Sequence, residues 1–351
     1  MTAELTAEAP RRVSMADVAK RAGVSAQTVS RVANGYEGVV DETRTAVLTA
    51  MAELGYRPNS AARALKRGEF RTIGVILFTL ATTGNMRTLE AIATSAAEAG
   101  YAITLIPGAP TEGSIRTAFT RVDEAAVDAV IVVMEMHLLD SAPFTLPPNA
   151  KVVIVDSDAG DRFPVVDTDQ ADGTRQAVQH LLDLGHSTVW HISGPEDSFS
   201  AERRARAWRS TLTAAGREVP GILHGDWSAE SGYRAGQTIA DTPECTAVFC
   251  ANDQMALGLY RALGERGLRV PHDVSIVGFD DIPEASSFSP PLTTVHQDFA
   301  EMGRQCVARV LTQLRTGSVE VGTTLVPTHL VLRDSTAPPR SDVRAESYET
   351  G

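Results

Sequence analysis

The spacing of apolar positions changes near residue 71 and divides the chain into a short first part and a long second part. Before this point, apolar side chains recur every three or four residues in short blocks that end at glycine or proline, which predicts short helices. From Thr72 onward, short β-rich apolar runs alternate with longer helical stretches. This alternation predicts βαβ units with parallel sheets, and therefore an α/β second part.

The first part begins with two short helices joined by a tight turn. Ser14 caps the first helix and forms a capping-box pattern with Asp17, and Gly23 ends it. Ser25 can cap the second helix, Ala26–Asn34. A glycine-containing turn this short predicts a sharp angle between the helices, as in a helix-turn-helix. The apolar side chains that can pack across this angle are Val18, Ala22, Val24, Val29 and Val32.

The second helix turns polar side chains outward, namely Gln27, Thr28, Ser30 and Arg31. Glutamine pairs well with adenine, arginine with guanine, and short hydroxyls with phosphate oxygens, so this face fits DNA. A surface helix of ordinary polarity has the same appearance, and the helix alone leaves both interpretations open.

Two further helical segments complete the first part. The apolar spacing of Asp41–Leu54 predicts a third amphipathic helix, which ends at Gly55. Pro58-Asn59 then interrupts the pattern, and Ser60–Arg67 is a helical segment too short to be stable alone in water. We expect this last segment to become ordered only when something docks against it.

The second part contains seven expected strands and at least four expected helices. The strands are Thr72–Leu77, Ala102–Ile106, Ala129–Val133, Lys151–Val155, Thr188–Ile192, Ala247–Cys250 and Val274–Phe279. The helices include Arg87–Ala99, Gly173–Leu184, Ala201–Ala215 and Gln254–Arg266. In parallel sheets, ligands lie just beyond the carboxyl ends of the strands, so the residues at those ends are candidates for a site.

Polar residues follow the ends of these strands. They are Asp156, Ser200 (as the cap of the next helix) with Arg204 one turn inside it, Trp227, Asn252-Asp253 and Asp280-Asp281. Each of them alone is explained as a turn residue or a helix cap, whereas their common placement favours a polar ligand cleft. Aspartate and asparagine bond to vicinal hydroxyls, an arginine adds a planar fork, and an indole can lie against a pyranose face. The carboxylates disfavour an anionic ligand, so the chemistry favours a neutral, polyhydroxylated one.

Composition and charge narrow the class of protein. With 351 residues, of which 43% are hydrophobic and 22% charged, the chain is long enough for two or three domains and is not a disordered or collagen-like chain. Residues 11–71 hold 11 lysines and arginines against 6 aspartates and glutamates, a charge of +5, although the whole chain carries −12. A basic first part on an acidic second part fits DNA binding confined to one end.

Several catalytic, metal and membrane signatures are absent from the sequence. Cys245, Cys250 and Cys306 lack the paired spacing of a zinc site and are expected to be buried thiols. The eight histidines form no HExxH pattern, and no phosphate loop or GxSxG elbow follows a strand. No apolar run suits a signal peptide or a membrane span. We therefore expect a cytoplasmic protein that is not an enzyme and has no metal, no cofactor and no membrane segment.

The first part resembles the DNA-binding head of the LacI/GalR family of transcriptional regulators. The resemblance lies in MADVAKRAGVSAQTVSRVANG, VDETRTAVLTAMAELGYRPNSAARALKRG and TIGVI, in this order. It implies that the second helix enters the major groove and that a hinge helix orders on DNA, with a leucine wedged into the minor groove. The DNA-binding residues that it implies are Ser25, Ala26, Gln27, Thr28, Ser30, Arg31, Asn34, Asn59, Ala62 and, as the wedge, Leu65. A family member with tyrosine at the position of Ala26 departs from this chain, so its operator sequence is not carried over.

The second part resembles the effector-binding body of the same family. The matching segments are GPEDSFSAERRARAW, GDWSAESGY, CANDQMALGLYRAL and VGFDDIPEASSFSPPLTTVHQDFAEMG. They imply effector contacts at Asp156, Ser200, Arg204, Trp227, Asn252, Asp280 and Phe299. A tryptophan at the position of Trp227 is not general in the family and favours a galactoside-like ligand. The apolar side of the pocket is expected from Thr82–Thr88, which departs from the family member that otherwise matches.

The implied fold is an all-α helix-turn-helix head with a hinge helix, joined to an α/β periplasmic-binding-protein-like body of two parallel-sheet subdomains. The expected divisions are a disordered arm 1–11, a DNA-binding domain 12–58, a hinge helix and linker 59–70, a body 71–337 and a disordered tail 338–351. Within the body, residues 71–168 with 299–326 form one subdomain, and 169–296 with 327–337 form the other. The C-terminal leucine helix that makes one family member a tetramer is missing, so a homodimer is expected. The helix Arg87–Ala99 is a candidate for its interface, or an ordinary sheet-packing helix.

The function implied is a sequence-specific repressor that binds double-stranded, pseudo-palindromic operator DNA and is released by a neutral sugar or glycoside. A regulator that needs a co-repressor ligand is the alternative. A sugar-binding protein without regulation leaves residues 11–71 unexplained, and a sugar-processing enzyme would use the acidic strand ends as acid and base.

Overall fold

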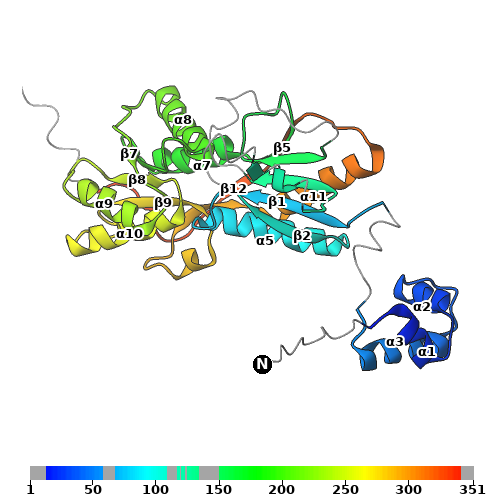
Figure 1. Ribbon diagram of the computed structural model, residues 1–351. Coiled ribbons are helices and arrows are strands. Elements are labelled where there is room, and N and C mark those ends of the chain that lie inside the picture. Colours follow the sequence, from blue (N-terminus) through cyan, green and yellow to red (C-terminus); the bar gives the residue numbers. More distant parts are fainter. Residues whose placement is uncertain are drawn as a thin grey trace, which may run out of the picture. The chain divides into compact units, whose positions relative to one another are not determined.

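The computed structural model describes residues 13–57, 68–108, 117–118, 120–122, 125–133 and 150–340. The chain divides into two compact units, Met1–Phe70 and Arg71–Gly351, and each is described by itself (Figure 1). The predicted hinge residues Asn59, Ala62 and Leu65 lie outside the described residues, as do the arm and residues 341–351 of the predicted tail.

Three helices form the described part of the first unit, α1 (Met15–Ala22), α2 (Ala26–Ala33) and α3 (Asp41–Leu54). Val18, Val29, Val32, Val47 and Met51 are buried between them. These side chains come from all three helices, so the angle between α1 and α2 is fixed by a shared apolar core rather than by the turn alone.

The ends of α1 and α2 follow from local hydrogen bonds. Ser14 and Asp17 form the predicted capping box, in which the Ser14 backbone amide donates to the Asp17 carboxylate over 2.8 Å. Gly23 ends α1 in the left-handed conformation with φ of 67°, where glycine meets no steric penalty. The second helix ends one residue earlier than expected, because the Asn34 side chain donates to the Ser30 carbonyl and caps it.

The first sheet of the second unit has six parallel strands in the order β11-β5-β4-β3-β1-β2. Its strands are β1 (Thr72–Leu77), β2 (Ala102–Pro107), β3 (Ala129–Val133), β4 (Val152–Val155), β5 (Pro164–Thr168) and β11 (Gly322–Val326). Two helices, α5 (Thr83–Glu98) and α11 (Phe299–Thr316), share a buried core with this sheet. We call this sheet with α5 and α11 the first subdomain.

The second sheet has the order β12-β10-β9-β8-β6-β7, with β12 antiparallel to β10 and the other described pairs parallel. Its strands are β6 (Trp190–Ser193), β7 (Leu223–His224), β8 (Ala247–Cys250), β9 (Ser275–Asp280), β10 (Thr293–Gln297) and β12 (Thr328–Val331). Helices α7 (Gln170–Asp183) and α8 (Phe199–Ala214) share one apolar core with it, and α9 (Ala229–Ala240) and α10 (Asp253–Glu265) share another. We call this layered unit the second subdomain (Figure 1).

The chain passes between the two subdomains three times, and each time one residue separates the elements that it joins. Asp169 links β5 to α7, Asp298 links β10 to α11, and Pro327 links β11 to β12. The first two linkers are helix caps: Asp169 accepts from the Asp172 amide and Asp298 accepts from the Glu301 amide. Three linkers of one residue hold the ends of the two sheets close together.

Most expected elements of the second unit are present within one or two residues of their expected ends. The sequence pattern missed the helices α9 and α11 and the strands β5, β7, β10, β11 and β12. Strand β5 begins with proline, β11 is largely half-exposed or exposed, and β7 has only two residues, so none of these three forms a long apolar run. Among the helices of the described residues, none is both long and apolar enough to span a bilayer.

Two further expectations concern helix α5 and the start of the tail. Leu89 and Ile92 of α5 pack in the core of the first subdomain, so these two side chains serve sheet packing. Residues 338–340, which begin the tail predicted to be disordered, are placed against the second subdomain, where Arg340 pairs with Asp273 at 2.7 Å. The domain boundaries otherwise stay predictions.

A pair of glycines in α10 tests how closely α9 and α10 pack. A Cβ on Gly258 would lie far inside contact distance of the Ala229 carbonyl oxygen in α9, whereas a Cβ on Gly264 would meet nothing. We expect Gly258→Ala to lower the free energy of unfolding by about 1–3 kcal/mol through overpacking. Gly264→Ala should raise it by about 0.5 kcal/mol, because alanine restricts the unfolded chain. Urea denaturation followed by circular dichroism measures both, and equal midpoints for the two variants would contradict the close packing.

Candidate functional site

The seven expected ligand contacts line one cavity between the two subdomains. They are Asp156, Ser200, Arg204, Trp227, Asn252, Asp280 and Phe299. Asp156 and Phe299 belong to the first subdomain and the other five to the second. The structure therefore brings together residues that are far apart in the sequence, at the carboxyl ends of strands from both sheets.

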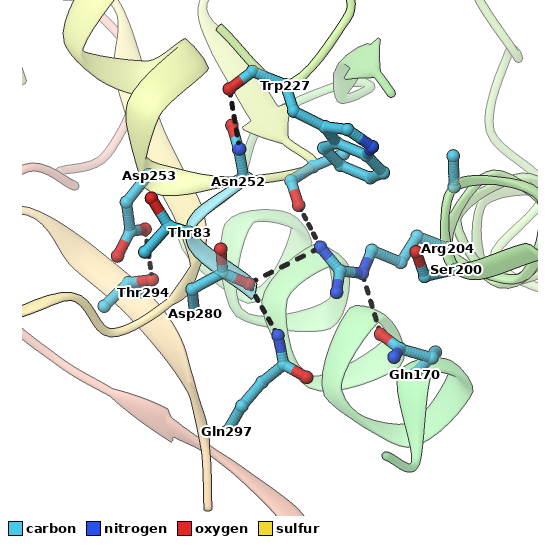
Figure 2. A network of polar contacts seen from close by, with 12 residues as sticks. Thr83, Gln170, Ser200, Arg204, Trp227, Asn252, Asp253, Asp280, Thr294 and Gln297 are labelled. Carbon is cyan, nitrogen blue, oxygen red and sulfur yellow. Dashed lines mark hydrogen bonds and ion pairs between the residues drawn. The ribbon is translucent and has the colours of Figure 1, made fainter. Parts of the chain in front are cut away.

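The Arg204 side chain lines this cavity, is only 4% exposed and lies at the centre of a network of polar contacts (Figure 2). Its Nε donates to the Gln170 side-chain oxygen over 2.8 Å, and Nη1 donates to the Ala251 carbonyl. The same Nη1 lies 3.7 Å from a carboxylate oxygen of Asp280. The guanidinium also lies over the Phe279 ring, 3.7 Å from its centroid, so it is held by polar groups and by an aromatic face together.

Asp280 ends strand β9 and faces Arg204. The Gln297 side-chain amide donates to its Oδ1 over 2.6 Å. Burial raises the pKa of Asp280 to about 6, although Arg204 and the Gln297 hydrogen bond both act to lower it. The neighbouring Asp281 does not line the cavity and pairs with His296 at 2.9 Å and Arg333 at 2.6 Å. The Asp280-Asp281 motif thus supplies one carboxylate to the cavity and one to the fold.

Asp156 and Ser200 lie on opposite sides of the boundary between the subdomains. Burial raises the pKa of Asp156 to about 6, and the charges of Arg203 and Arg204 oppose this. Ser200 does line the cavity, but its expected role as a helix cap is wrong. The helix begins earlier, at Phe199, so Ser198 is the cap and accepts from the Ala201 amide, while Ser200 lies in the first turn.

Asn252 and Trp227 are fixed to each other. Asn252 caps α10, with Oδ1 accepting from the Met255 amide over 2.8 Å and Nδ2 donating to the Trp227 carbonyl over 3.0 Å (Figure 2). The Trp227 ring lies against Gly194, where any Cβ would collide with it. Helix capping and ligand contact are therefore compatible in Asn252, because its amide keeps one N–H and one lone pair for a further partner.

Backbone strain is concentrated at this cavity. Asp156, Trp227 and Asp280 have φ of 56°, 70° and 112°, in the region that side chains other than glycine rarely adopt. Asp156 directly follows β4, Asp280 is the last residue of β9, and Trp227 lies three residues after β7, so all three stand where the chain leaves a strand. Such strain persists only where the surroundings enforce it, and it is common at ligand sites.

The sequence pattern missed several residues that line the same cavity. They are Asp167, Thr168, Gln170, Gln297 and Met302, among others. The segment Thr82–Thr88 was expected to give the apolar side, but the side chains it contributes are mostly threonine and asparagine. Asp167 and Thr168 end strand β5, so recognition of PVVDT as a strand would have revealed them.

Asp253 is part of the fold rather than of the cavity. It is fully buried, accepts from the Thr294 hydroxyl over 2.6 Å and accepts from the Ile282 amide over 2.9 Å (Figure 2). Burial raises its pKa well above the ordinary value. These bonds tie the start of α10 to strand β10 and to the loop after Asp280, so Asp253 positions Asp280 indirectly.

The second candidate site is the outer face of α2 in the first unit. Ser25, Ala26, Gln27, Arg31 and Asn34 are exposed. Thr28 and Ser30 are half-buried and bond locally, to the Ser25 hydroxyl and the Asn34 amide. Arg31 lies near the ring of Tyr36, with 5.5 Å between the guanidinium carbon and the ring centroid. The exposed face of α2 thus presents the Gln27 amide and the Arg31 guanidinium beside the small side chain of Ala26.

No metal-binding arrangement occurs among the described residues, where no three histidine, cysteine, aspartate or glutamate side chains are grouped to hold an ion. Cys245, Cys250 and Cys306 are free and buried, as expected. Burial raises the pKa of Cys245 and Cys306 to about 12, so these thiols stay protonated and unreactive.

Comparisons with known proteins match both units. The family of bacterial regulatory proteins named lacI matches residues 14–59, and the periplasmic binding protein-like domain family matches residues 178–336. The lactose operon repressor of Escherichia coli (strain K12) is 36% identical over 94% of this chain and 92% of its own length. The repressor PurR of Pasteurella multocida (strain Pm70) is 32% identical over 91% of this chain and 97% of its own length.

Solved structures extend the match to three dimensions. A Lac repressor dimer bound to operator and the anti-inducer ONPF has a TM-score of 0.82 at 35% identity, and covers 93% of this chain and all of that one. A complex of the transcriptional regulator CelR with cellobiose has a TM-score of 0.67 at 30% identity, and covers 92% of this chain and all of that one. The helix-turn-helix unit, the two-subdomain body and these matches over nearly the whole length show that the chain belongs to the LacI family, as a DNA-binding transcriptional repressor with a ligand-binding domain.

Proposed function

We propose that this repressor binds a pseudo-palindromic operator as a homodimer and is released from it by a neutral sugar or glycoside, with a galactoside favoured. The observation that carries the proposal is the convergence of Arg204, Asp280, Asn252 and Trp227 in one cavity. This set combines acceptors, donors and a flat apolar ring, which is the combination that a pyranose requires.

The individual groups match hydroxyl chemistry. Asp156 and Asp280 offer carboxylate oxygens to hydroxyl donors, and Asn252 keeps one N–H and one lone pair. The Trp227 ring supplies an apolar face for the C–H side of a sugar. Three lining carboxylates, with Asp167 as the third, disfavour an anionic ligand.

For the DNA side, we propose contacts from Ser25, Ala26, Gln27, Thr28, Ser30, Arg31 and Asn34 in the major groove. Asn59, Ala62 and Leu65 of the proposed hinge would contact the minor groove, with Leu65 as the wedge. A helix-turn-helix reads only a few base pairs, so a two-fold dimer with half-sites about one turn apart supplies the remaining specificity. The operator-bound Lac repressor dimer in the comparison supports this arrangement.

The proposed coupling runs through the one-residue linkers between the subdomains. A ligand in the cavity contacts residues of both subdomains, so it favours one angle between them over another. A changed angle between the first subdomains of a dimer would separate the two hinge segments and release the operator. The reverse coupling, in which the ligand acts as a co-repressor, uses the same geometry with the opposite sign.

Fluorescence anisotropy of a labelled duplex tests the proposal. The duplex comes from the DNA upstream of the gene, or from repeated selection out of a random pool, and is saturated with protein before sugars are added. Release by methyl galactoside supports the proposal, and tighter binding with a ligand identifies a co-repressor instead. If the protein selects no sequence from the pool, the proposed operator binding is contradicted. If it binds no sugar by calorimetry, the proposed sugar effector is contradicted.

Two arginines of α8 separate ligand binding from DNA binding. Arg204→Lys removes the planar fork that bonds Gln170, Ala251 and Asp280, so we expect sugar affinity to fall at least tenfold while operator affinity stays unchanged. The matched control is Arg206→Lys, because Arg206 is exposed and pairs with Glu202 on the surface. Equal sugar affinity for the two variants, measured by calorimetry, would remove Arg204 from the site.

Sugar affinity should weaken as the pH falls through about 6. The pKa of both Asp156 and Asp280 is about 6 in the folded protein, and hydroxyl donors bind best to the ionised carboxylates. Binding therefore releases protons near this pH, and affinity levels off above about pH 7. Calorimetry in two buffers of different ionisation enthalpy measures affinity and proton release together. Constant affinity between about pH 5 and pH 8 would show that these carboxylates do not accept from the ligand.

The outer face of α2 gives a separate prediction. Arg31→Ala should weaken operator binding about tenfold to a hundredfold and should bring the affinities for operator and scrambled duplex closer together. Arg21→Ala removes the same charge from α1, where Arg21 pairs with Glu53 at 2.6 Å, and should retain the preference for operator. A full preference in the Arg31 variant would contradict base recognition by α2.

A further inference from the structure

The wall that the first subdomain contributes to the cavity holds buried oxygen atoms that have no hydrogen-bond partner in the part of the protein that the structure describes. Asp167 ends strand β5 with its side chain only 1% exposed. Its Oδ2 pairs with Arg203, whereas its Oδ1 has no hydrogen-bond partner within the described part of the chain. The Asp156 Oδ1 and the Thr168 hydroxyl oxygen are also buried and have no hydrogen-bond partner within the described residues. All three residues line the cavity.

Two of the other polar side chains of this wall already donate within the protein. The Asn85 amide donates to the Thr79 carbonyl over 3.1 Å, and the Thr88 hydroxyl donates to the Met302 sulfur over 3.8 Å. The groups that this wall leaves for a ligand are therefore two carboxylate oxygens, which can accept but not donate, and the Thr168 hydroxyl, which can do either.

Buried acceptors without donors are unfavourable, and a ligand that supplies donors removes this penalty. An alkyl or aryl group against the same wall would cover Asp167 Oδ1 and leave it unpaired. A site of this kind discriminates strongly against an analogue that lacks the polar group, because the protein's own buried group is then left without a partner.

We propose that Asp167, with Asp156 and Thr168, forms a subsite for a hydrogen-bond-donating substituent on the sugar, and that Asp167 selects such effectors over glycosides with apolar aglycones. This inference rests on the proposed function, because it assigns the second half of the same ligand. The substituent must carry a hydrogen-bond donor, which can be either a hydroxyl or an ammonium group.

A purely structural role for Asp167 is the competing explanation. Arg203 comes from α8 of the second subdomain, and it also donates to the Ser157 carbonyl and to Asp158, each over 3.1 Å. Asp167 therefore bridges the subdomains as well as lining the cavity. Asp158 also pairs with Arg203, but its side chain is 72% exposed and it does not line the cavity. A variant at Asp158 therefore tests the bridge to Arg203 without changing the cavity wall.

A matched ligand series tests the proposal on the full-length protein. The ligands are methyl, ethyl, 2-hydroxyethyl and 2-aminoethyl β-galactoside, which differ only at the aglycone. For the unaltered chain, we expect the hydroxyethyl or the aminoethyl compound to bind at least about tenfold more tightly than the ethyl compound. If the aminoethyl compound alone shows the gain, the donor is an ammonium group, and if both do, a hydroxyl is sufficient.

Two variants then assign the preference to a residue. Asp167→Asn should reduce the preference over the ethyl compound to less than about threefold, with the larger loss for the aminoethyl compound, since the amide lacks the charge. The methyl compound is the reference for each variant, because the preference is a ratio of affinities and a change in affinity common to all four ligands cancels. Asp158→Asn should keep the full preference, and a thermal melt of each variant verifies that it is folded.

The outcomes distinguish the subsite from the proposed function. Ethyl galactoside that binds as tightly as both donor-bearing compounds overturns the subsite, and this result needs no variant. An equal loss of preference in both variants assigns the effect to the Arg203 bridge and overturns the role of Asp167. If methyl galactoside does not bind but another methyl glycoside does, the same series on that sugar decides the question. If no methyl glycoside binds, the proposed function fails and the subsite fails with it.

Discussion

The buried Arg204 guanidinium is the interaction on which the cavity and the linkers between the subdomains both depend. It bonds to Gln170, which follows the first linker residue, Asp169, and to Asp280, which Gln297 holds just before the second linker residue, Asp298. Through the Ala251 carbonyl it also fixes the end of β8. A buried charge of this kind is tolerated only when its hydrogen-bonding capacity is filled, so its partners cannot move independently. A ligand that displaces the bond to Gln170 or the contact with Asp280 is therefore felt at the adjoining linker.

The cavity lowers the stability of the protein at neutral pH. The pKa of Asp156 and Asp280 is about 6 in the folded state and about 4 in an unfolded chain, so the folded state binds protons more tightly. The stability gained from this is present below about pH 4 and is lost as the pH rises through about 6. Backbone strain at Asp156, Trp227 and Asp280 adds to the cost. The apolar cores of the two sheets offset the cost of burying these carboxylates and the cost of the backbone strain. A ligand with hydroxyl donors would reduce the cost of the buried carboxylates.

The sequence predicts the strand-end residues of this site where the strand before them forms a clear apolar run. Asp156, Asn252 and Asp280 follow the apolar runs VVIV, AVFC and SIVGF, so their position at strand ends is readable. Asp167 ends PVVDT, where the proline and the short apolar stretch conceal strand β5, and its burial depends on Arg203 from a distant helix. The two serines around Phe199 show a second limit. Only the starting point of α8 decides that Ser198 caps the helix and that Ser200 is left for the cavity.

Contacts across the cavity decide what a ligand can change. Arg203 bridges to Ser157, Asp158 and Asp167 on one side, and Gln254 of α10 donates to the Thr83 hydroxyl of α5 over 2.8 Å on the other. A ligand shifts an equilibrium between two subdomain angles only by the difference in its affinity for them. It must therefore add contacts that exist at one angle alone, or compete with these bridges. Because Asp167 belongs both to the cavity wall and to a bridge, a donor on the ligand at this point acts on affinity and on the subdomain angle together.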